Sequence, residues 1–351
     1  MIIGCCGFTS TGSSAVSDYL KEFDDICAFD RKEFVLAYYP DGLEDLDYQL
    51  NCNCSKYSAS VVAIARFRLF VHNYLVAGME KMQKKELYDA CEQFISAITQ
   101  VKWRGYGAAD YQLHNNRFAR WYILKLRRIG VILERHFHLR FNYFPAHDME
   151  FSIQPAQFLE ESKIFVRKVL EIYGADLNKP VVLDQPYCGN NPGKSFKYFD
   201  DPIAIVVDRD PRDNYLFAKI FLRSKGNGRQ IPTDDVRSFV EYYRRMRDNQ
   251  PYKEDVRVLR VCFEDMIYRY DETTRKICEF CGLNPADRKR KIFAPELSIK
   301  NTQLYKKYTQ YADDIKYIED ALRDYLFPFE DFGEVDTRGE MFYGKSPLNK
   351  S

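Results

Sequence analysis

The chain has 351 residues, with 52 Lys and Arg against 51 Asp and Glu and a net charge of +1. This length favours one large domain, or one domain with a sizeable insertion. The near balance of charge gives the whole protein no pull toward nucleic acids or acidic membranes, so any anion-binding site must be local and no nucleic-acid partner is expected.

The apolar segments and the cysteines bear on location and on metal binding. No apolar run is long enough to span a bilayer, and the chain begins with a strand pattern instead of a basic and then apolar leader. We therefore expect a cytoplasmic protein whose ten cysteines are reduced. Cys52 and Cys54 could form half of a metal site, but no second Cys or His pair with zinc spacing accompanies them, so no metal is expected.

The first elements of the chain are predicted to be a strand, a loop and a helix. An apolar segment at residues 1–6 leads into a loop rich in glycine and hydroxyl residues, from Gly7 to Ser14. The apolar residues that follow recur at the spacing of one helix face: Val16, Tyr19, Leu20 and Phe23. Amides at the start of such a helix have no partner within it, so they favour a bound phosphate or sulfate.

This loop has the outline of a phosphate-binding loop. Gly7 and Gly12 would let the backbone bend closely around an anion, and Ser13 and Ser14 offer hydroxyl donors. Ser13 stands where the pattern G-x-x-x-x-G-K-[ST] has its lysine, which disfavours an ordinary nucleotide triphosphatase. The alternative is a serine-rich turn that binds nothing.

Farther along the chain, short apolar runs alternate with helical patterns. Strands are predicted at 26–29, 181–184, 203–207 and 256–263, and helices at 157–173, 214–223, 234–247, 272–281 and 309–326. The stretch 55–174 shows helical periodicity with very few strand signals. This order predicts an α/β fold, a three-layer P-loop-type sandwich with a central parallel sheet, in which 1–351 form a single domain and 55–174 a large helical insertion.

A second anion-binding feature follows the strand predicted at 203–207. Arg209 comes directly after this apolar run, at the sheet edge where the glycine-rich loop is also expected. Its guanidinium can bind a phosphate through two hydrogen bonds, and Pro211 can begin the next helix. The alternative is a surface network of Arg and Asp pairs.

The chain resembles the sulfotransferase superfamily in four stretches. Thr11-Gly-Ser-Ser14 is similar to the family's 5′-phosphosulfate loop, and Val206-Val-Asp-Arg-Asp-Pro-Arg-Asp213 is similar to its 3′-phosphate motif. Residues 260–265 with 277–283 resemble a further strand-and-helix motif of the family. Residues 297–301 with 305–308 resemble the tails of bacterial members that act on carbohydrate, whereas the helical insertion is not covered.

The resemblance implies transfer of a sulfuryl group from 3′-phosphoadenosine-5′-phosphosulfate to a hydroxyl or amine of a carbohydrate or related acceptor, with no metal. The donor-binding residues that it implies are Thr9, Ser10, Thr11, Gly12, Ser13, Ser14, Arg209, Arg212, Lys300 and Asn301. The insertion would cover the donor cleft and form the acceptor site. Its aromatic residues could stack on sugars, although such residues more often belong to a core: Trp103, Tyr106, Tyr111, Trp121 and Tyr122.

Two positions depart from the family pattern. The family usually has Lys or Arg where this chain has Ser10, which removes a cation that would stabilise the sulfuryl group and the leaving phosphate. Basic residues that could substitute are Arg31, Lys32 and Lys194. The family also usually has Ser where this chain has Phe217, which removes one contact to the 3′-phosphate.

The transfer also needs a base to accept the acceptor's proton. Glu33 is the first candidate, because Lys32-Glu33 resembles the segment that supplies the carboxylate in heparan-type sulfotransferases, and the alternative is an exposed charged loop. Asp184, at the end of an apolar strand, is the second candidate, with a capping role as the alternative. The five histidines all lie in the helical region, and none matches the position of the family's catalytic histidine.

Two other functions remain open from the sequence. A P-loop kinase of a small metabolite would share the fold and the first loop, but the missing lysine and the lack of an evident magnesium partner count against it. A degenerate member that binds a nucleotide or glycan without turnover is compatible with Ser10 and Phe217.

Overall fold

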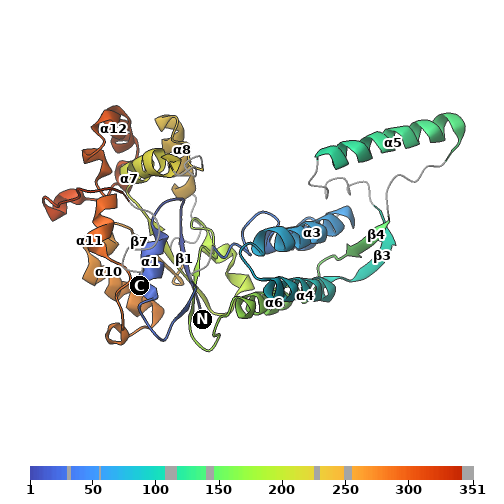
Figure 1. The fold of residues 1–351 in the computed structure, drawn as a ribbon, viewed down its shortest axis with the longest axis horizontal. Helices are drawn as coiled ribbons and strands as arrows, with labels where there is room; N and C mark the ends of the chain where they lie inside the picture. Colours follow the sequence, from blue (N-terminus) through green and yellow to red (C-terminus); the bar gives the residue numbers. More distant parts are fainter. Residues whose placement is uncertain are drawn as a thin grey trace. The chain divides into compact units, whose positions relative to one another are not determined.

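The computed structural model describes residues 1–29, 33–54, 57–106, 117–139, 146–224, 230–248 and 255–341. The chain divides into two units, one formed by Met1–Val35 with Ala175–Ser351 and the other by Leu36–Gly174. The first unit carries the central sheet, and the second is mostly helical (Figure 1).

A parallel sheet of five strands organises the first unit. Its order is β2-β5-β1-β6-β7, with bounds β1 Ile2–Gly7, β2 Cys27–Ala28, β5 Val181–Asp184, β6 Pro202–Asp208 and β7 Val258–Cys262. β1 lies in the centre, since it pairs in parallel with both β5 and β6. The short apolar runs of these strands predicted this arrangement, because a strand covered on both faces needs no polar alternation. The α/β fold with a central parallel sheet is therefore confirmed.

Helices pack against the sheet and against one another around two apolar clusters. The first joins strand residues such as Ile3 and Ile205 to α1 (Ser13–Leu20) and α10 (Tyr270–Cys281). The second lies among α7 (Pro211–Leu216), the π-helical segment Phe217–Leu222, α8 (Val236–Asp248) and α12 (Ala312–Ala321). Short helices α9 (Asp265–Tyr268) and α11 (Pro295–Ser298) complete the unit.

One helix begins earlier than its apolar pattern predicted. The helix expected at 214–223 starts as α7 at Pro211, which takes the first helical position as proposed from the sequence. The carboxylate of Asp210 caps this helix, because it accepts a hydrogen bond from the Arg212 amide at 2.9 Å. The cap fixes the backbone directly after β6, where Arg209 lies.

The second unit is built from five α-helices of the described ranges. These are α2 (Leu43–Asp47), α3 (Tyr57–Phe70), α4 (Lys81–Ile98), α5 (Arg117–Phe137) and α6 (Phe158–Ile172). The rings of Phe67, Phe94 and Phe165 pack together with centroids 5.1–5.9 Å apart. No helix in the described ranges is long and apolar enough to cross a bilayer.

An antiparallel pair of strands in this unit was missed by the sequence reasoning. β3 (Val101–Gly105) pairs with β4 (His147–Phe151), with Trp103 opposite Met149. The described part of 55–174 therefore holds two short strands among its helices, where the sequence showed very few strand signals. β3 is exposed at four of its five positions and carries Lys102 and Arg104, so it has none of the buried apolar runs that marked the central strands.

Candidate functional site

The loop between β1 and α1 is closed by Thr11. The Thr11 hydroxyl accepts a hydrogen bond from the Phe8 amide at 3.0 Å and donates one to the Phe8 carbonyl at 2.9 Å. The Thr11 amide donates to the same carbonyl at 3.2 Å. Both polar groups of this buried residue are therefore used inside the loop, and Thr11 shapes the loop instead of facing a ligand.

Glycine is required at two points of this loop. A Cβ at Gly7 would lie 2.4 Å from the Thr11 hydroxyl oxygen. Gly12 has φ +86°, and a Cβ there would lie 2.5 Å from the ring of Phe263. Among the described residues, the amides of Gly12, Ser13 and Ser14 donate no hydrogen bond, so they remain available to an anion at the start of α1.

Gln185, a residue that the sequence reasoning did not single out, holds the loop from the neighbouring strand. It follows β5, and its side-chain amide donates to the Ser13 hydroxyl at 2.8 Å. Its side-chain carbonyl accepts from the Gly7 amide at 3.3 Å. Only its place directly after Asp184, at the end of an apolar strand, could have indicated this role.

Arg209 joins this loop to the C-terminal part of the unit. Its guanidinium donates one hydrogen bond to the Ser10 carbonyl at 3.1 Å and another to the Asn301 carbonyl. The ring of Phe217 lies 4.7 Å from the guanidinium carbon and that of Phe263 lies 5.1 Å from it. Arg209 is 4% exposed, and its Nε is buried without a hydrogen-bond partner.

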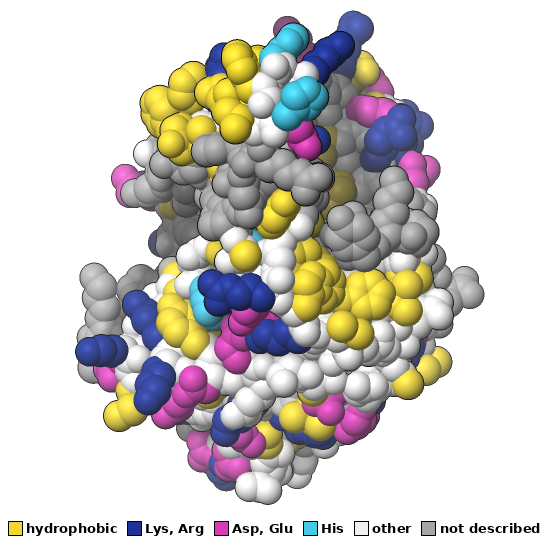
Figure 2. All heavy atoms as spheres, turned by 90° about the vertical axis from the view of Figure 1, so that its right-hand side faces the viewer, with side chains coloured by type: hydrophobic (Ala, Val, Ile, Leu, Met, Phe, Trp, Pro, Cys, Tyr) yellow, Lys and Arg dark blue, Asp and Glu magenta, His cyan; other side chains and the backbone are white. Residues whose placement is uncertain are grey.

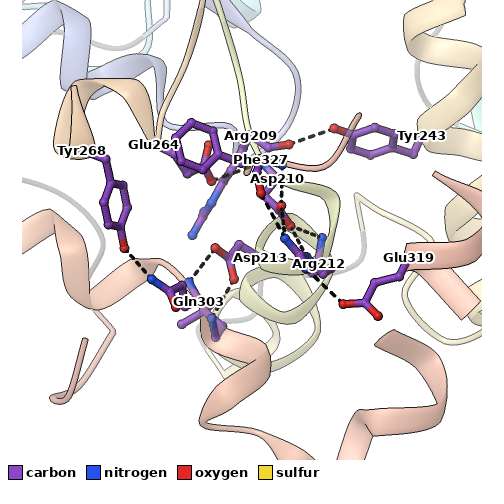
Figure 3. A network of polar contacts seen from close by, with 11 residues as sticks. Arg209, Asp210, Arg212, Asp213, Tyr243, Glu264, Tyr268, Gln303, Glu319 and Phe327 are labelled. Carbon is purple, nitrogen blue, oxygen red and sulfur yellow. Dashed lines mark hydrogen bonds and ion pairs between the residues drawn. The ribbon is translucent and has the colours of Figure 1, made fainter. Parts of the chain in front are cut away.

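The charge of Arg209 has no direct counter-ion among the described residues. Figure 3 shows the acidic residues nearby, each with other partners. Asp210 pairs with Arg212, and both oxygens of Asp213 accept backbone amides at 2.7 and 2.8 Å. Burial raises the pKa of the Glu264 carboxyl well above its usual range. Burial lowers the pKa of Arg209, and the charges of Asp213, Glu264 and Asp210 oppose this shift.

A pocket opens beside Arg209. The predicted site residues that line it are Ser10, Gly12, Ser14, Arg209 and Asn301. The rest of the wall consists of Ala15, Asp18, Phe217, Phe263, Ile292, Phe293, Ala294, Leu297 and Ser298. The fold thus brings the glycine-rich loop and the end of β6 to one edge of the sheet, where the carboxyl ends of parallel strands meet, and the C-terminal segment 292–301 lies beside them.

Other predicted donor residues lie outside the pocket wall. Ser13 is held by Gln185, and the Thr9 carbonyl accepts a hydrogen bond from the Asn214 side chain at 3.0 Å. The Lys300 carbonyl accepts a hydrogen bond from Lys307 Nζ at 2.7 Å. These residues support the walls of the pocket through their neighbours.

Arg212 belongs to a buried network instead of the pocket. It binds Asp210 through Nε at 3.0 Å and Nη2 at 2.8 Å, and Glu319 through Nη1 at 3.0 Å (Figure 3). Its guanidinium lies over the ring of Tyr305 at 4.4 Å. Of the two arginines in the motif, only Arg209 faces the pocket, because the carboxylate that caps α7 draws Arg212 to the other side.

Two carboxylates lie together near the end of β5. The Asp184 carbonyl accepts a hydrogen bond from the Phe34 amide at 2.7 Å, which holds Glu33 close to Asp184. Burial, and next the charge of Glu33, raise the pKa of Asp184 to about 6. Glu33 lies at the surface, where the surrounding protein removes part of its hydration and raises its pKa. One oxygen of Asp184 is buried without a hydrogen bond.

Of the three basic residues proposed to replace the missing loop cation, the structure describes one. Arg31 and Lys32, the latter also a catalytic candidate, lie outside the described residues. Lys194 lies in a short 3₁₀ segment, Pro192–Lys194, that follows β5.

A cluster of possible metal ligands lies in the second unit. The ligand atoms of His72, Cys91 and Glu92 lie within 4.8 Å of one another. Both oxygens of Glu92 already accept hydrogen bonds from Arg68, at 2.6 and 3.0 Å. Burial raises the pKa of the Cys91 thiol to about 12. A thiol that stays protonated beside a carboxylate paired with an arginine makes a poor ligand set for a cation.

Together the sheet, the glycine-rich loop and the pocket beside Arg209 define an α/β protein with a candidate site at the carboxyl ends of its strands. The model of the sulfotransferase family matches residues 3–287. The chain therefore belongs to the sulfotransferase family, and this membership counts against the P-loop kinase considered from the sequence.

More distant comparisons add little to this assignment. The crystal structure of sulfotransferase STF9 from Mycobacterium avium is similar at a TM-score of 0.37 and 11% identity, over 96% of this chain and 78% of that chain. At this level the likeness carries no argument about the site. A search of curated proteins finds no significant match.

The buried network predicts that Arg212 matters for stability. We expect Arg212→Ala to lower the free energy of unfolding by about 3 kcal/mol, because it strips the buried Asp210 carboxylate of its charged partner. Arg245→Ala removes an exposed pair with Glu241 and should change it by less than about 0.5 kcal/mol. Urea denaturation of both variants measures the difference. If Arg212→Ala were as stable as the wild type, the structural role of Arg212 would be refuted.

Proposed function

We propose that the protein transfers a sulfuryl group from 3′-phosphoadenosine-5′-phosphosulfate to a hydroxyl or amine of a carbohydrate or related acceptor. The observation that carries the proposal is the buried guanidinium of Arg209, which lines a pocket and has no counter-ion among the described residues. A buried cation of this kind gains most from a bound anion, since desolvation strengthens their attraction.

The donor's two anionic ends fit two features of the pocket. The amides of Gly12, Ser13 and Ser14 at the start of α1 would bind the 5′-phosphosulfate. Arg209, which lines the pocket, would bind the 3′-phosphate through its guanidinium. Phe217 fills the place where the family usually has a serine, so the guanidinium is held between rings instead of sharing the phosphate with a hydroxyl.

The chemical step needs positioning, charge stabilisation and a base. The attacking atom of the acceptor forms a bond to sulfur while the bond from sulfur to the donor phosphate breaks, and the loop amides stabilise the charge on the departing oxygens. Asp184 and Glu33 are the proposed bases. The raised pKa of Asp184, about 6, suits a group that must take up a proton near neutral pH.

Acceptor recognition is proposed for the second unit. Trp103 is 38% exposed and Tyr106 is 50% exposed, so both rings are accessible to a sugar face. Trp121 and Tyr122 are also exposed, whereas Tyr111 lies outside the described residues. That the unit covers the donor cleft stays a prediction, and the cytoplasmic location of the protein is likewise proposed.

Donor binding is the first prediction to test. Isothermal titration calorimetry with adenosine 3′,5′-bisphosphate should show micromolar binding, and Arg209→Ala should weaken it at least tenfold, roughly the worth of one charge-assisted contact. Arg209→Lys keeps the positive charge but loses the two parallel N–H donors of the guanidinium, so it should also weaken binding of the bisphosphate. Arg245→Ala, at an exposed arginine of the same unit, is the matched control. Binding of a non-hydrolysable ATP analogue with magnesium in place of the bisphosphate would support a kinase instead.

Ser10 distinguishes an enzyme from a degenerate member. Ser10 lines the pocket, so Ser10→Lys would place a cation beside the bound donor. The backbone of Ser10 has φ +66°. If the protein has lost activity because it lacks this cation, Ser10→Lys should raise the rate of sulfuryl transfer about tenfold or more in an assay with labelled donor. If the wild type is active and Ser10→Lys does not raise its rate, another basic residue already stabilises the sulfuryl group. Ser10→Gly, which relaxes the same backbone without adding charge, is the control.

The carboxylates predict a pH dependence. If Asp184 is the base, kcat/KM should rise as the pH increases through about 6, because only the ionised carboxylate can take up a proton. The Asp184→Asn variant should lose this rise, and its kcat should fall about a hundredfold. Because folding raises this pKa above its unfolded value near 3.8, ionisation costs stability. The wild type should therefore lose stability relative to Asp184→Asn as pH rises from about 4 to about 6. If the rise in kcat/KM with pH persists in Asp184→Asn but disappears in Glu33→Gln, Glu33 is the base.

A further inference from the structure

Helix α5 concentrates positive charge. It runs from Arg117 to Phe137 and carries six Lys or Arg against one acidic residue, Glu134. The helix therefore has a net charge of +5, whereas the whole chain has +1. Such a local excess attracts anionic partners that the protein as a whole would not attract.

The same helix exposes a stripe of large apolar residues. Phe118 is 80% exposed, Tyr122 57%, Ile129 49% and Ile132 53%. Their spacing of four, seven and three residues places them on one side of the helix, with Trp121, 58% exposed, beside them. Figure 2 shows hydrophobic side chains gathered at this end of the molecule, with basic and histidine side chains next to them.

Helix α8 shows the more usual arrangement, with its apolar side buried. Its Phe239, Val240 and Tyr243 are at most 4% exposed. In α5 only part of the helix is covered: Ile123 is 8% exposed, while the stripe through Phe118 and Ile129 is open. An open apolar stripe of this length on a water-facing helix indicates a surface that is covered when the protein is at work.

The basic residues flank this stripe. At 100° per residue, Arg117, Arg128 and Arg135 fall on one side of it, and Arg120 and Arg127 lie farther round the helix. Lys125 lies within the stripe, and its ammonium lies 5.7 Å from the ring of Trp121. Apolar residues bordered by cations on a single helix are the pattern of a helix that lies in a membrane interface.

We propose that α5 docks the protein on the surface of a membrane that contains anionic lipids. The helix lies parallel to the surface, its apolar stripe enters the boundary between headgroups and acyl chains, and its arginines contact lipid phosphates. It does not cross the bilayer, in keeping with the absence of a membrane-spanning helix in the described ranges. This inference does not depend on the proposed sulfuryl transfer.

Charge and side-chain chemistry favour a lipid surface over other occupants. A second copy of α5 would bring +5 against +5. Sugars stack on aromatic rings such as Trp121 and Tyr122, but they gain little from the aliphatic Ile129 and Ile132. A nucleic acid would use the arginines and leave these aliphatic residues in water. Of these occupants, an anionic membrane matches both the charge and the apolar stripe.

The tryptophans allow a direct test on the full chain. The protein has two, Trp103 and Trp121, so Trp103→Phe leaves Trp121 as the single reporter. Vesicles of phosphatidylcholine with about a quarter phosphatidylglycerol should shift its emission to the blue, and brominated acyl chains should quench it. Vesicles of phosphatidylcholine alone should bind at least about tenfold more weakly, and added salt should weaken the anionic binding. Unchanged emission with the anionic vesicles would overturn the proposal.

Vesicle flotation of matched variants separates the two contributions. Arg127→Glu with Arg128→Glu, and separately Ile129→Ser with Ile132→Ser, should each reduce flotation with anionic vesicles about tenfold or more. The controls on α4 are Lys81→Glu with Lys85→Glu for charge, and Met82→Ser, at a position 70% exposed, for apolar area. Equal flotation of the isoleucine variant would show that no insertion occurs. A wild-type dimer that the isoleucine variant abolishes, with no flotation of either protein, would identify a second copy as the occupant.

Discussion

A buried guanidinium without a counter-ion is the constraint on which the candidate site depends. Arg209 reaches the Ser10 carbonyl on one side and the Asn301 carbonyl on the other, so a single side chain fixes the distance between the loop after β1 and the C-terminal segment. Asp210 pairs with Arg212, and Asp213 accepts two backbone amides, so neither carboxylate forms a direct ion pair with Arg209. An anion in the pocket would supply the direct partner that this buried cation lacks, and would thereby couple the local fold to ligand binding.

The two departures from the family pattern have different physical meanings. Phe217 packs against the Arg209 guanidinium, so the loss of a hydroxyl is accompanied by a ring that holds the cation in place. Ser10 has no such compensation within the described residues: it lines the pocket, and its carbonyl serves Arg209. The chemical capacity of the site therefore depends on which residue, if any, supplies a second cation. The carboxylate pair of Asp184 and Glu33, in contrast, already has the raised pKa values of groups that exchange protons.

The second unit brings different chemistry to the same chain. Its core of packed phenylalanine rings is ordinary, but its α5 leaves apolar residues and a charge of +5 open to water. A protein with almost no net charge can in this way carry a strong local attraction for anionic surfaces.

The sequence by itself determined the sheet, the loop and the family resemblance, because these depend on local order: apolar runs mark buried strands, and glycines mark a backbone that bends around an anion. It also placed Arg209 at the sheet edge. Only the tertiary structure showed that Arg212 binds Asp210 and Glu319. It likewise showed that the Thr11 hydroxyl bonds within its own loop and that Gln185 donates to the Ser13 hydroxyl. The contacts of Arg212 with Glu319 and of Gln185 with Ser13 join residues far apart in the chain, and the short-range ones depend on side-chain directions that the sequence does not give. The exposed stripe of α5 is also a tertiary property, since a pattern of apolar spacing does not say whether anything covers it.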